Sequence, residues 1–376
     1  MSTHDEKELA LLEKISREFA VKALLDDVAE NDAYPSGKFP VKALEKAFDL
    51  GFFHTLLPEQ LDGIGRQLGP YCTVLKGICE IDAGVGGILF ANTFAQEVLL
   101  LAEAEEVLAS IVKSGAGVLP FLTGFQIFNN PSETGPIPRA EKTDRGYRLS
   151  GTAEYVVLGG TARRCLVPAS FAGNPSFSYF LVDCENNAVH RSEPIISLGL
   201  HACPAVDLEF EKVEGILVGR EGMGQHYFSM ACERLFCAMA AMALGVITGS
   251  FKSAFDYSRK RIQGGKKIID WTEVQMMLAN LACRLKTAEV MVDAAWRAAD
   301  KKAKGWEQTG EAAAIHLMDL AGKFTSDGIQ ILGGYGYIKE YGQEKYFRDA
   351  KQLQALARIF PMKKIRYLKK HYRLSA

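Results

Sequence analysis

The amino-acid sequence predicts an α+β protein in which two helical regions flank a middle β domain. The length of 376 residues predicts two or three packed units, at roughly 100 to 200 residues per domain. Apolar residues recur at helical spacing near both ends of the chain and in short strand-like runs between them. A hydrophobic fraction of 48% with 24% charged residues excludes a disordered or fibrous chain. We therefore expect a helical domain over residues 1–118, a β domain over residues 119–228 and a helical bundle over residues 229–376.

The N-terminal region carries the spacing of amphipathic helices. Leu12, Ile15 and Phe19 fall on one helical stripe, and a second apolar segment covers residues 41–53. A passage rich in Gly and Pro at residues 57–65 interrupts the pattern.

Residues 119–228 have a different character. Short runs rich in Val, Leu, Tyr and Phe are separated by Gly, Pro, Asn and Asp, which is typical of strands joined by turns. Such runs cover residues 147–149, 155–158, 177–182 and 206–210.

Helical spacing returns after residue 229, where apolar residues follow one another by threes and fours. The longest stripe comprises Val274, Met277, Leu278, Leu281, Leu285, Ala288 and Val292. Stripes of this kind predict a packed helical bundle.

The charges and cysteines of the sequence limit the kinds of function that this protein can have. Lys and Arg number 44 against 45 Asp and Glu, so there is no global cationic field to hold a nucleic acid. The eight cysteines form no C-x-x-C pair and have no matching His cluster, which predicts free thiols, no metal site and a reducing, cytoplasmic location. The acidic N-terminus and the lack of an apolar stretch of about 18 residues predict neither a signal peptide nor a membrane span.

Two C-terminal motifs carry a resemblance to a known family. Residues 330–337 read Gln-Ile-Leu-Gly-Gly-Tyr-Gly-Tyr, and residues 344–351 read Glu-Lys-Tyr-Phe-Arg-Asp-Ala-Lys. Further matching pieces follow the family's order at residues 50–52, 58–65, 146–151 and 198–199 and at Arg234, Tyr257 and Arg261. Over nearly its whole length the sequence resembles the FAD-dependent acyl-CoA dehydrogenases. Their N-terminal helical domain, middle β domain and C-terminal four-helix bundle imply the same division of this chain.

The resemblance implies a site for FAD that two chains share. In the family, the segment matched by Gln330, Gly333 and Gly334 reaches across a dimer interface to the FAD of the neighbouring subunit, and the Arg matched by Arg261 contacts that cofactor's phosphates. The residue types suit this role, because Arg is a planar, permanently charged donor and glycine lets a backbone approach a bulky group. A loop that ends a helix and a surface Arg are the alternative interpretations.

The β domain is expected to supply the other cofactor contacts. Tyr155, Val156 and Val157 match the segment that lies against the flavin ring, and Tyr155 keeps an aromatic stacking face. Val157 replaces the family's Thr, whose hydroxyl bonds flavin N5, so that contact would have to come from the backbone. Thr123 and Ser132 match, at a longer spacing, residues of the loop that contacts the pyrophosphate, with simple turn residues as the alternative interpretation.

The substrate and catalytic positions are only partly retained. Arg234, at the expected start of an apolar helix, matches the family position near the pantetheine arm of CoA. The family's catalytic Glu sits eight residues beyond the Asp matched by Asp349, and Ala357 occupies that position here. A methyl group cannot accept a proton, so we expect a displaced or non-standard base and name no catalytic residue.

Three other titratable residues are weighed as candidates. Asp82 and Glu340 match structural positions of the family, and His201 is expected to lie at the surface.

These features predict an FAD-dependent oxidoreductase that acts on an acyl-CoA thioester, with cyclic, branched or β-substituted acyl groups among the candidates. The resemblance implies an electron acceptor such as an electron-transfer flavoprotein, and a homotetramer. Two alternatives stay open. One is a non-catalytic or half-active subunit of a hetero-oligomer, which the missing Glu favours, and the other is a flavin oxidase or monooxygenase on the same fold.

Overall fold

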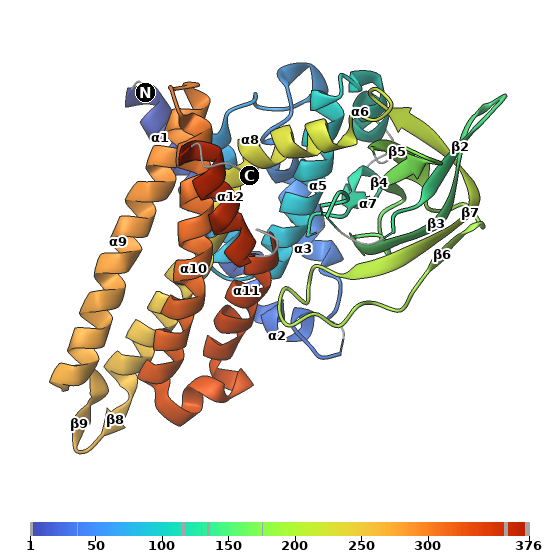
Figure 1. The fold of residues 1–376 in the computed structure, drawn as a ribbon. Helices are drawn as coiled ribbons and strands as arrows, with labels where there is room; N and C mark the ends of the chain where they lie inside the picture. Colours follow the sequence, from blue (N-terminus) through green and yellow to red (C-terminus); the bar gives the residue numbers. More distant parts are fainter. Residues whose placement is uncertain are drawn as a thin grey trace.

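The computed structural model describes residues 3–35, 37–113, 117–128, 130–133, 136–174, 176–356 and 360–372. Helices fill both ends of the described chain and a curled sheet lies between them in the sequence, so the predicted α+β architecture is confirmed. In space the sheet lies to one side of the long helices (Figure 1).

The elements follow in three groups. The first helices are α1 (Thr3–Ala23), α2 (Val28–Asn31), α3 (Val41–Asp49), α4 (Leu68–Cys79), α5 (Ala83–Leu101), α6 (Glu105–Val112) and α7 (Val118–Phe121). The strands of the sheet are β1 (Thr123–Phe125), β2 (Arg139–Thr143), β3 (Gly146–Val157), β4 (Arg164–Phe171), β5 (Phe177–Asp183), β6 (Val189–Arg191) and β7 (Ala205–Val218). The later elements are α8 (Gly224–Lys260), the hairpin of β8 (Ile262–Gln263) and β9 (Lys266–Lys267), α9 (Thr272–Asp300), α10 (Trp306–Leu332), α11 (Gln343–Leu356) and α12 (Phe360–Tyr372).

The N-terminal helices bury the stripe that their spacing predicts. Phe19 on α1 is buried, and its ring meets that of Phe52 edge to face with centroids 5.3 Å apart. Leu12 and Ile15 are partly buried against the same core. Asp82 caps α5 by accepting a hydrogen bond of 2.9 Å from the Gly84 amide, in keeping with the structural role expected of it.

The sheet contains the predicted runs, except for Leu158, which follows the end of β3. Residues 147–149 and 155–157 lie in β3, residues 177–182 in β5 and residues 206–210 in β7. Strand β4 was not singled out from the sequence, and Pro168 interrupts its apolar stretch. Strand β1 pairs with both β3 and β4, so the segment that enters the sheet from α7 lies beside the end of β3.

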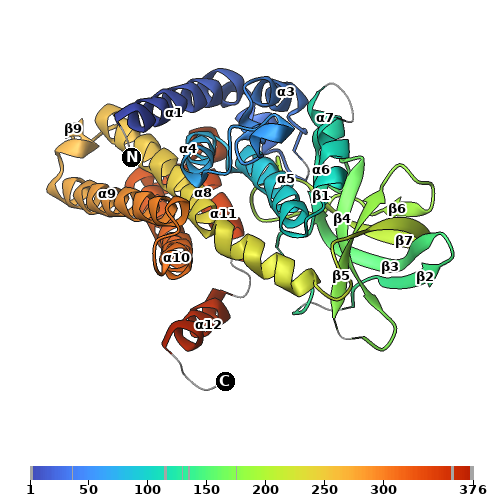
Figure 2. The same cartoon turned by 90° about the horizontal axis from the view of Figure 1, so that it is seen from above.

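The C-terminal bundle consists of α8, α9, α10 and α11, and α12 lies outside it beside α10 (Figure 2). Helix α8 begins at Gly224, ten positions before Arg234, so the expectation that Arg234 stands at a helix start is wrong. The helix starts earlier because Tyr227, Phe228 and Ala231 continue its buried stripe.

Two helices have the length and composition of membrane spans, but both serve as core. The apolar windows of α5 and α8 are 89% and 83% buried inside the protein. All eight cysteines are free and seven of them are buried, which confirms the prediction of free thiols.

Helices α4 and α8 approach closely at two glycines of α8. A Cβ atom at Gly245 would lie 2.6 Å from the carbonyl oxygen of Lys76, and one at Gly249 would lie 2.2 Å from that of Glu80. Both obstacles are backbone atoms, which cannot rotate away. The contact therefore requires glycine at both positions.

We expect Gly249→Ala to lower the free energy of unfolding by about 1–3 kcal/mol, because the added methyl group forces α4 and α8 apart. Gly310→Ala in α10 is the matched control, since a Cβ there would lie 3.4 Å from Phe236 Cβ. The control is expected to be neutral or to gain up to about 1 kcal/mol from helix propensity. Urea denaturation measures the stability of both variants. Equal stability of the two would contradict the close approach of α4 and α8.

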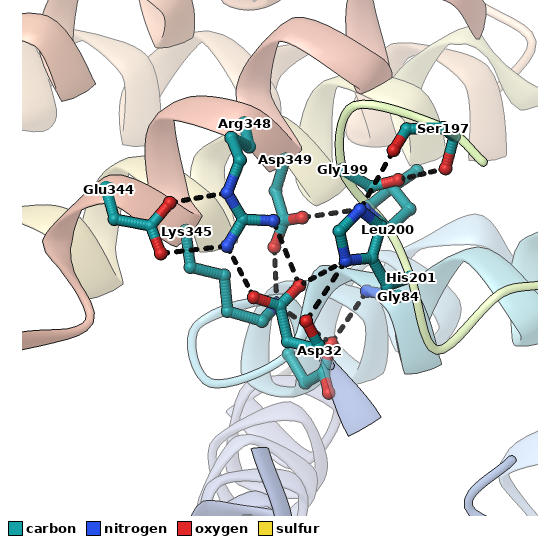
Figure 3. A network of polar contacts seen from close by, with 11 residues as sticks. Asp32, Gly84, Ser197, Gly199, Leu200, His201, Glu344, Lys345, Arg348 and Asp349 are labelled. Atoms are coloured by element: carbon teal, nitrogen blue, oxygen red, sulfur yellow. Dashed lines mark hydrogen bonds and ion pairs between the residues drawn. The ribbon is translucent and has the colours of Figure 1, made fainter. Parts of the chain in front are cut away.

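A buried network of charges joins the first helices and the β domain to α11 (Figure 3). Lys345 Nζ lies 3.1 Å from Asp82 Oδ1 and 2.6 Å from Asp349 Oδ2. The other oxygen of Asp349 accepts a hydrogen bond of 2.8 Å from the amide of Leu200, in the loop before β7. This branch of the network ties α5, the β domain and α11 together through one buried lysine.

The second branch of the network contains His201, so the expectation of a surface histidine is wrong. Its side chain is 7% exposed, and Nδ1 lies 3.2 Å from Asp32 Oδ1. Nε2 lies 2.9 Å from the carbonyl oxygen of Ser197, and Nδ1 is also 3.1 Å from that of Asp32. Arg348 of α11 binds the same Asp32 carboxylate with both terminal nitrogens and pairs with Glu344. His201 is buried because this cluster and the neighbouring Leu200 contact hold its loop against α11.

The protonated form of His201 suits these surroundings, since both ring nitrogens face acceptors. The hydrogen bond to Asp32 raises the pKa of His201, although burial opposes the charge. Burial likewise opposes ionisation of Asp32, but hydrogen bonds from His201 and Arg348 hold the pKa of Asp32 well below its usual range.

We expect His201→Gln to lower the free energy of unfolding by about 1–3 kcal/mol at pH 6 and by less at pH 9. Because its folded-state pKa is raised, the contribution of His201 is complete below the ordinary pKa of 6.5 and is lost as the pH rises through the folded-state value. His190→Gln is the control, since the His190 side chain is 51% exposed beside Glu211. Urea denaturation at pH 6 and pH 9 measures the loss of stability caused by His201→Gln. The same loss at both pH values would contradict a protonated His201.

Candidate functional site

A pocket of about 540 Å³ opens at the end of the bundle, where α8 and α10 finish. Arg261, Gln330 and Gly333, three of the residues predicted to hold FAD, line this pocket together with the aromatic rings of Tyr257 and Trp271. The structure thus brings together residues that lie about 70 positions apart in the chain.

Arg261 presents an unused donor in this pocket. It directly follows α8, and its guanidinium lies 5.0 Å from the centroid of the Tyr335 ring. Its Nε atom is buried and has no hydrogen-bond partner among the described residues. A buried, charged donor without a partner suits a phosphate group supplied from outside.

The glycines after α10 differ in what surrounds them. Gly333 ends the helix with φ of 61° and ψ of −136°, a conformation that favours glycine. A Cβ at Gly333 or Gly334 would meet no described atom within 4 Å, whereas one at Gly336 would lie 2.5 Å from the carbonyl oxygen of Ile329. Gly336 therefore serves the chain's own packing, while the space beside Gly333 and Gly334 is open to another group.

Tyr155 lies at an irregularity of β3. The pairing of β3 with β7 shifts register between Ala153 and Val156, and Tyr155 has a φ of 56°. A bulge with left-handed backbone re-aims a side chain and is frequent beside functional sites. The Tyr155 hydroxyl accepts a hydrogen bond of 3.1 Å from Gln352 Nε2 on α11. The bulge thereby links the sheet to the helix that leads to the predicted base position.

The two valines that follow are fully buried on opposite faces of the sheet. Val156 packs in the core of the β domain, and Val157 packs in the main core shared with the first helices. Their side chains are occupied by packing, and their backbones pair with β7 and, at Val157, with β1.

Thr123 and Ser132, the two residues predicted to contact the pyrophosphate, have different surroundings. Thr123 stands on β1, whose Phe125 pairs with Val157, and its buried hydroxyl has no hydrogen-bond partner among the described residues. The Ser132 hydroxyl donates to Gln225 Oε1, in the first turn of α8, at 2.5 Å. Both side chains therefore lie at the sheet end of α8.

The two groups of predicted cofactor residues lie at opposite ends of the molecule. The β8–β9 hairpin beside Arg261 and the sheet are on opposite sides in both views (Figures 1 and 2). Gln225 contacts the Ser132 loop near the start of α8, and Arg261 follows its last residue. At 1.5 Å per residue the helix separates these ends by about 50 Å, which is longer than an FAD molecule.

Arg234 is held in an ionic cluster on the N-terminal half of α8. Glu97 of α5 is 1% exposed, and its carboxylate lies 2.7 Å from Arg66 Nη2 and 3.1 Å from Arg234 Nε. Arg234 also donates to the carbonyl oxygen of Arg66. The arginine predicted to lie near CoA is thus anchored to α5 and to the segment before α4.

The predicted base position, Ala357, lies outside the described residues, between Leu356 at the end of α11 and Phe360 at the start of α12. Glu340, another candidate, is exposed in a 3₁₀ turn at Lys339–Tyr341.

Sequence reasoning passed over one carboxylate close to these elements. Glu233 precedes Arg234 on α8, and its Oε1 lies 2.6 Å from Lys370 Nζ on α12. The Glu233 side chain is 33% exposed. In the sequence, the one feature that could have pointed to Glu233 is its place beside Arg234, next to an apolar helical stripe.

These features fit FAD and offer little to a metal. The unpartnered Arg261 Nε and the open side of Gly333 and Gly334 are positions that the cofactor would fill. Among the described residues, no three His, Cys, Asp or Glu side chains are grouped to hold a metal ion.

Known proteins share this sequence and fold. The family model for the acyl-CoA dehydrogenase N-terminal domain matches residues 6–109, and the model for the C-terminal domain matches residues 221–357. Cyclohex-1-ene-1-carbonyl-CoA dehydrogenase of Syntrophus aciditrophicus is 29% identical, over 93% of this chain and 86% of the relative. The caffeyl-CoA reductase-Etf complex subunit CarC of Acetobacterium woodii is 27% identical, over 91% and 92%.

A solved structure shows the same fold. Butyryl-CoA dehydrogenase of Megasphaera elsdenii superimposes with a TM-score of 0.83 at 24% identity, covering 95% of this chain and 96% of that one. Because both terminal domains match and relatives align over some nine tenths of its length, the chain belongs to the acyl-CoA dehydrogenase family of FAD-dependent enzymes.

Proposed function

We propose that this protein oxidises an acyl-CoA thioester with Glu233 as the base that removes the α proton. FAD, when bound, would supply the hydride acceptor that this oxidation requires. The observation that carries this proposal is the position of Glu233, a partly exposed carboxylate on α8 beside Arg234 and facing α12.

The location of Glu233 supports this role on geometric grounds. Glu233 lies on α8 and pairs with Lys370 in the last turn of α12, the helix that follows the position matched to the family's base in the sequence. Carboxylates are common catalytic bases, and neither Ala357 nor the neighbouring Leu356 could accept a proton.

For the cofactor, we propose a division between two chains. Thr123, Ser132, Tyr155, Val156 and Val157 of one chain would hold the flavin and pyrophosphate. The bundle-end pocket of a second chain, with its Arg261, Gln330, Gly333 and Gly334, would close on the other end. The separation of about 50 Å along α8 supports this arrangement, which requires at least a dimer and is met by the homotetramer that the resemblance implies.

For the substrate and acceptor, the named relatives guide the proposal. One relative acts on a cyclic acyl-CoA and another belongs to an Etf complex. We favour a cyclic or branched acyl group and an electron-transfer flavoprotein as acceptor. Arg234 would lie along the CoA arm in this arrangement, with Glu97 and Arg66 fixing its position.

We expect Glu233→Gln to slow reductive bleaching of the flavin by about 10²- to 10⁴-fold, because the variant lacks the base, while FAD content is unchanged. Anaerobic stopped-flow absorbance with butyryl-, octanoyl-, palmitoyl- and cyclohexanecarbonyl-CoA measures the rate. Glu340→Gln is the matched control and is expected to bleach like the original protein.

The outcomes separate the alternatives. Adding Ala357→Glu to the Glu233→Gln variant should restore part of the rate, since it returns a carboxylate to the family position. Full activity of Glu233→Gln would refute the base. A flavin-loaded protein that none of the thioesters bleaches would favour the non-catalytic subunit, and rapid reoxidation by oxygen alone would favour an oxidase.

A further inference from the structure

Ion pairs join helix α12 to the rest of the protein, and four of its apolar side chains are exposed. Its apolar residues Met362, Ile365, Leu368 and Tyr372 are 42–62% exposed. Figure 2 shows the helix outside the bundle. What joins it to the body is a row of cations that meet acidic side chains. These pairs are Lys363–Glu311, Lys364–Asp319, Arg366–Glu133, Lys370–Glu233 and His371–Glu311.

Glu311 of α10 is the anchor of this attachment. Its side chain is 4% exposed, and its oxygens lie 3.1 Å from Lys363 Nζ, 3.0 Å from His371 Nε2 and 3.7 Å from Lys370 Nζ. Burial opposes the charge of Glu311, but these cations hold its pKa below the usual value. The last two turns of α12 are therefore fixed over α10 and the N-terminal part of α8.

Lys370 differs from the other cations because it bridges the anchor and the proposed base. Its Nζ lies 2.6 Å from Glu233 Oε1 and 3.7 Å from Glu311 Oε2. The anchor on α10 and the carboxylate on α8 thus meet at one ammonium group. Glu233 has Arg234 as its neighbour on α8, but that guanidinium is taken by Glu97.

We propose that Lys370 is the positioning residue of this enzyme: it fixes the Glu233 carboxylate for proton abstraction and holds α12 over the site. This inference rests on the proposed function, because it assigns the partner of the proposed base. A carboxylate on a flexible side chain loses effective concentration when its orientation is free, and misplacement by about 1 Å can reduce a rate roughly 10²-fold. Lys370 restricts Glu233 through a short, charge-assisted bond.

Lys370→Met is the variant that tests the inference. In the flavin-loaded holoenzyme, with the thioester that bleaches the flavin fastest as the probe, we expect kcat to fall about 10- to 100-fold. KM and FAD content should stay within about twofold, since Lys370 orients the base and is not expected to bind the thioester or the flavin. Lys370→Arg should restore most of the rate, because a guanidinium can make the same contact.

Lys364→Met is the matched control, since Lys364 lies on the same helix and meets Asp319 on α10. It should keep kcat within about twofold of the original protein, whereas a loss equal to that of Lys370→Met would overturn the proposal. In the Glu233→Gln background, Lys370→Met should cause no further loss, because the group that it positions is gone. An additional loss there, or an unchanged kcat in Lys370→Met alone, would equally overturn it.

A second measurement, of hydrogen exchange, tests the attachment of α12 without depending on catalytic activity. Amide hydrogen exchange of the last two turns of α12 should become faster in Lys370→Met and, in the original protein, at 1 M salt, since screening weakens ion pairs. Slow exchange under both conditions would contradict an ionic attachment.

If Glu233→Gln stays active, the proposed base fails. If Glu233→Gln is inactive while Lys370→Met keeps its kcat, this inference alone fails.

Discussion

The length of α8 sets the distance between the two groups of proposed cofactor residues. The helix runs for 37 residues and is buried along much of its course against α4 and α10. Glu233 and Arg261 therefore stand about 40 Å apart on one rigid element. Between these two residues, α8 packs closely against the α4 segment at Gly245 and Gly249. Any ligand that needs both ends must receive them from different chains.

The β domain contacts both α8 and α11. The bulge at Tyr155 turns toward Gln352 of α11, and the Ser132 loop contacts Gln225. The buried network around Lys345 and Asp32 fixes α11 against the first helices and the β domain. This network does not touch the proposed base. Its function is to set the position of the helix from which the segment before α12 departs.

Much of the fold could be predicted from the sequence, because hydrophobic spacing directly reflects burial. The stripes of α1 and α9 and the strand runs in β3, β5 and β7 all lie where the apolar pattern placed them. The start of α8 and the burial of His201 could not be predicted so well. The early start of α8 continues an apolar stripe back to Tyr227, whereas the burial of His201 depends on its contact with Asp32, which no local pattern records.

The candidate site could likewise be predicted only in part from the sequence. Arg261, Gln330 and Gly333 were expected together on the strength of the motif, and the pocket contains all three. Glu233 was missed because an acidic residue beside an apolar helical stripe resembles an ordinary solvated position. Only the structure shows that it faces α12 and Lys370. The division of the cofactor residues into two distant groups likewise becomes visible only when the length of α8 is known.

The most direct test of a shared site is complementation between two defective chains. Arg261→Ala should impair FAD binding at the bundle end, and Glu233→Gln should impair catalysis at the sheet end, so each homo-oligomer is inactive at limiting FAD. Mixed oligomers formed by co-expression contain sites in which Glu233 comes from one chain and Arg261 from the other. Activity should then recover to about a quarter of the original value, because half of the dimers are mixed and each has one intact site. If co-expressed chains are as inactive as either variant alone, both groups belong to a site within one chain and the account is contradicted.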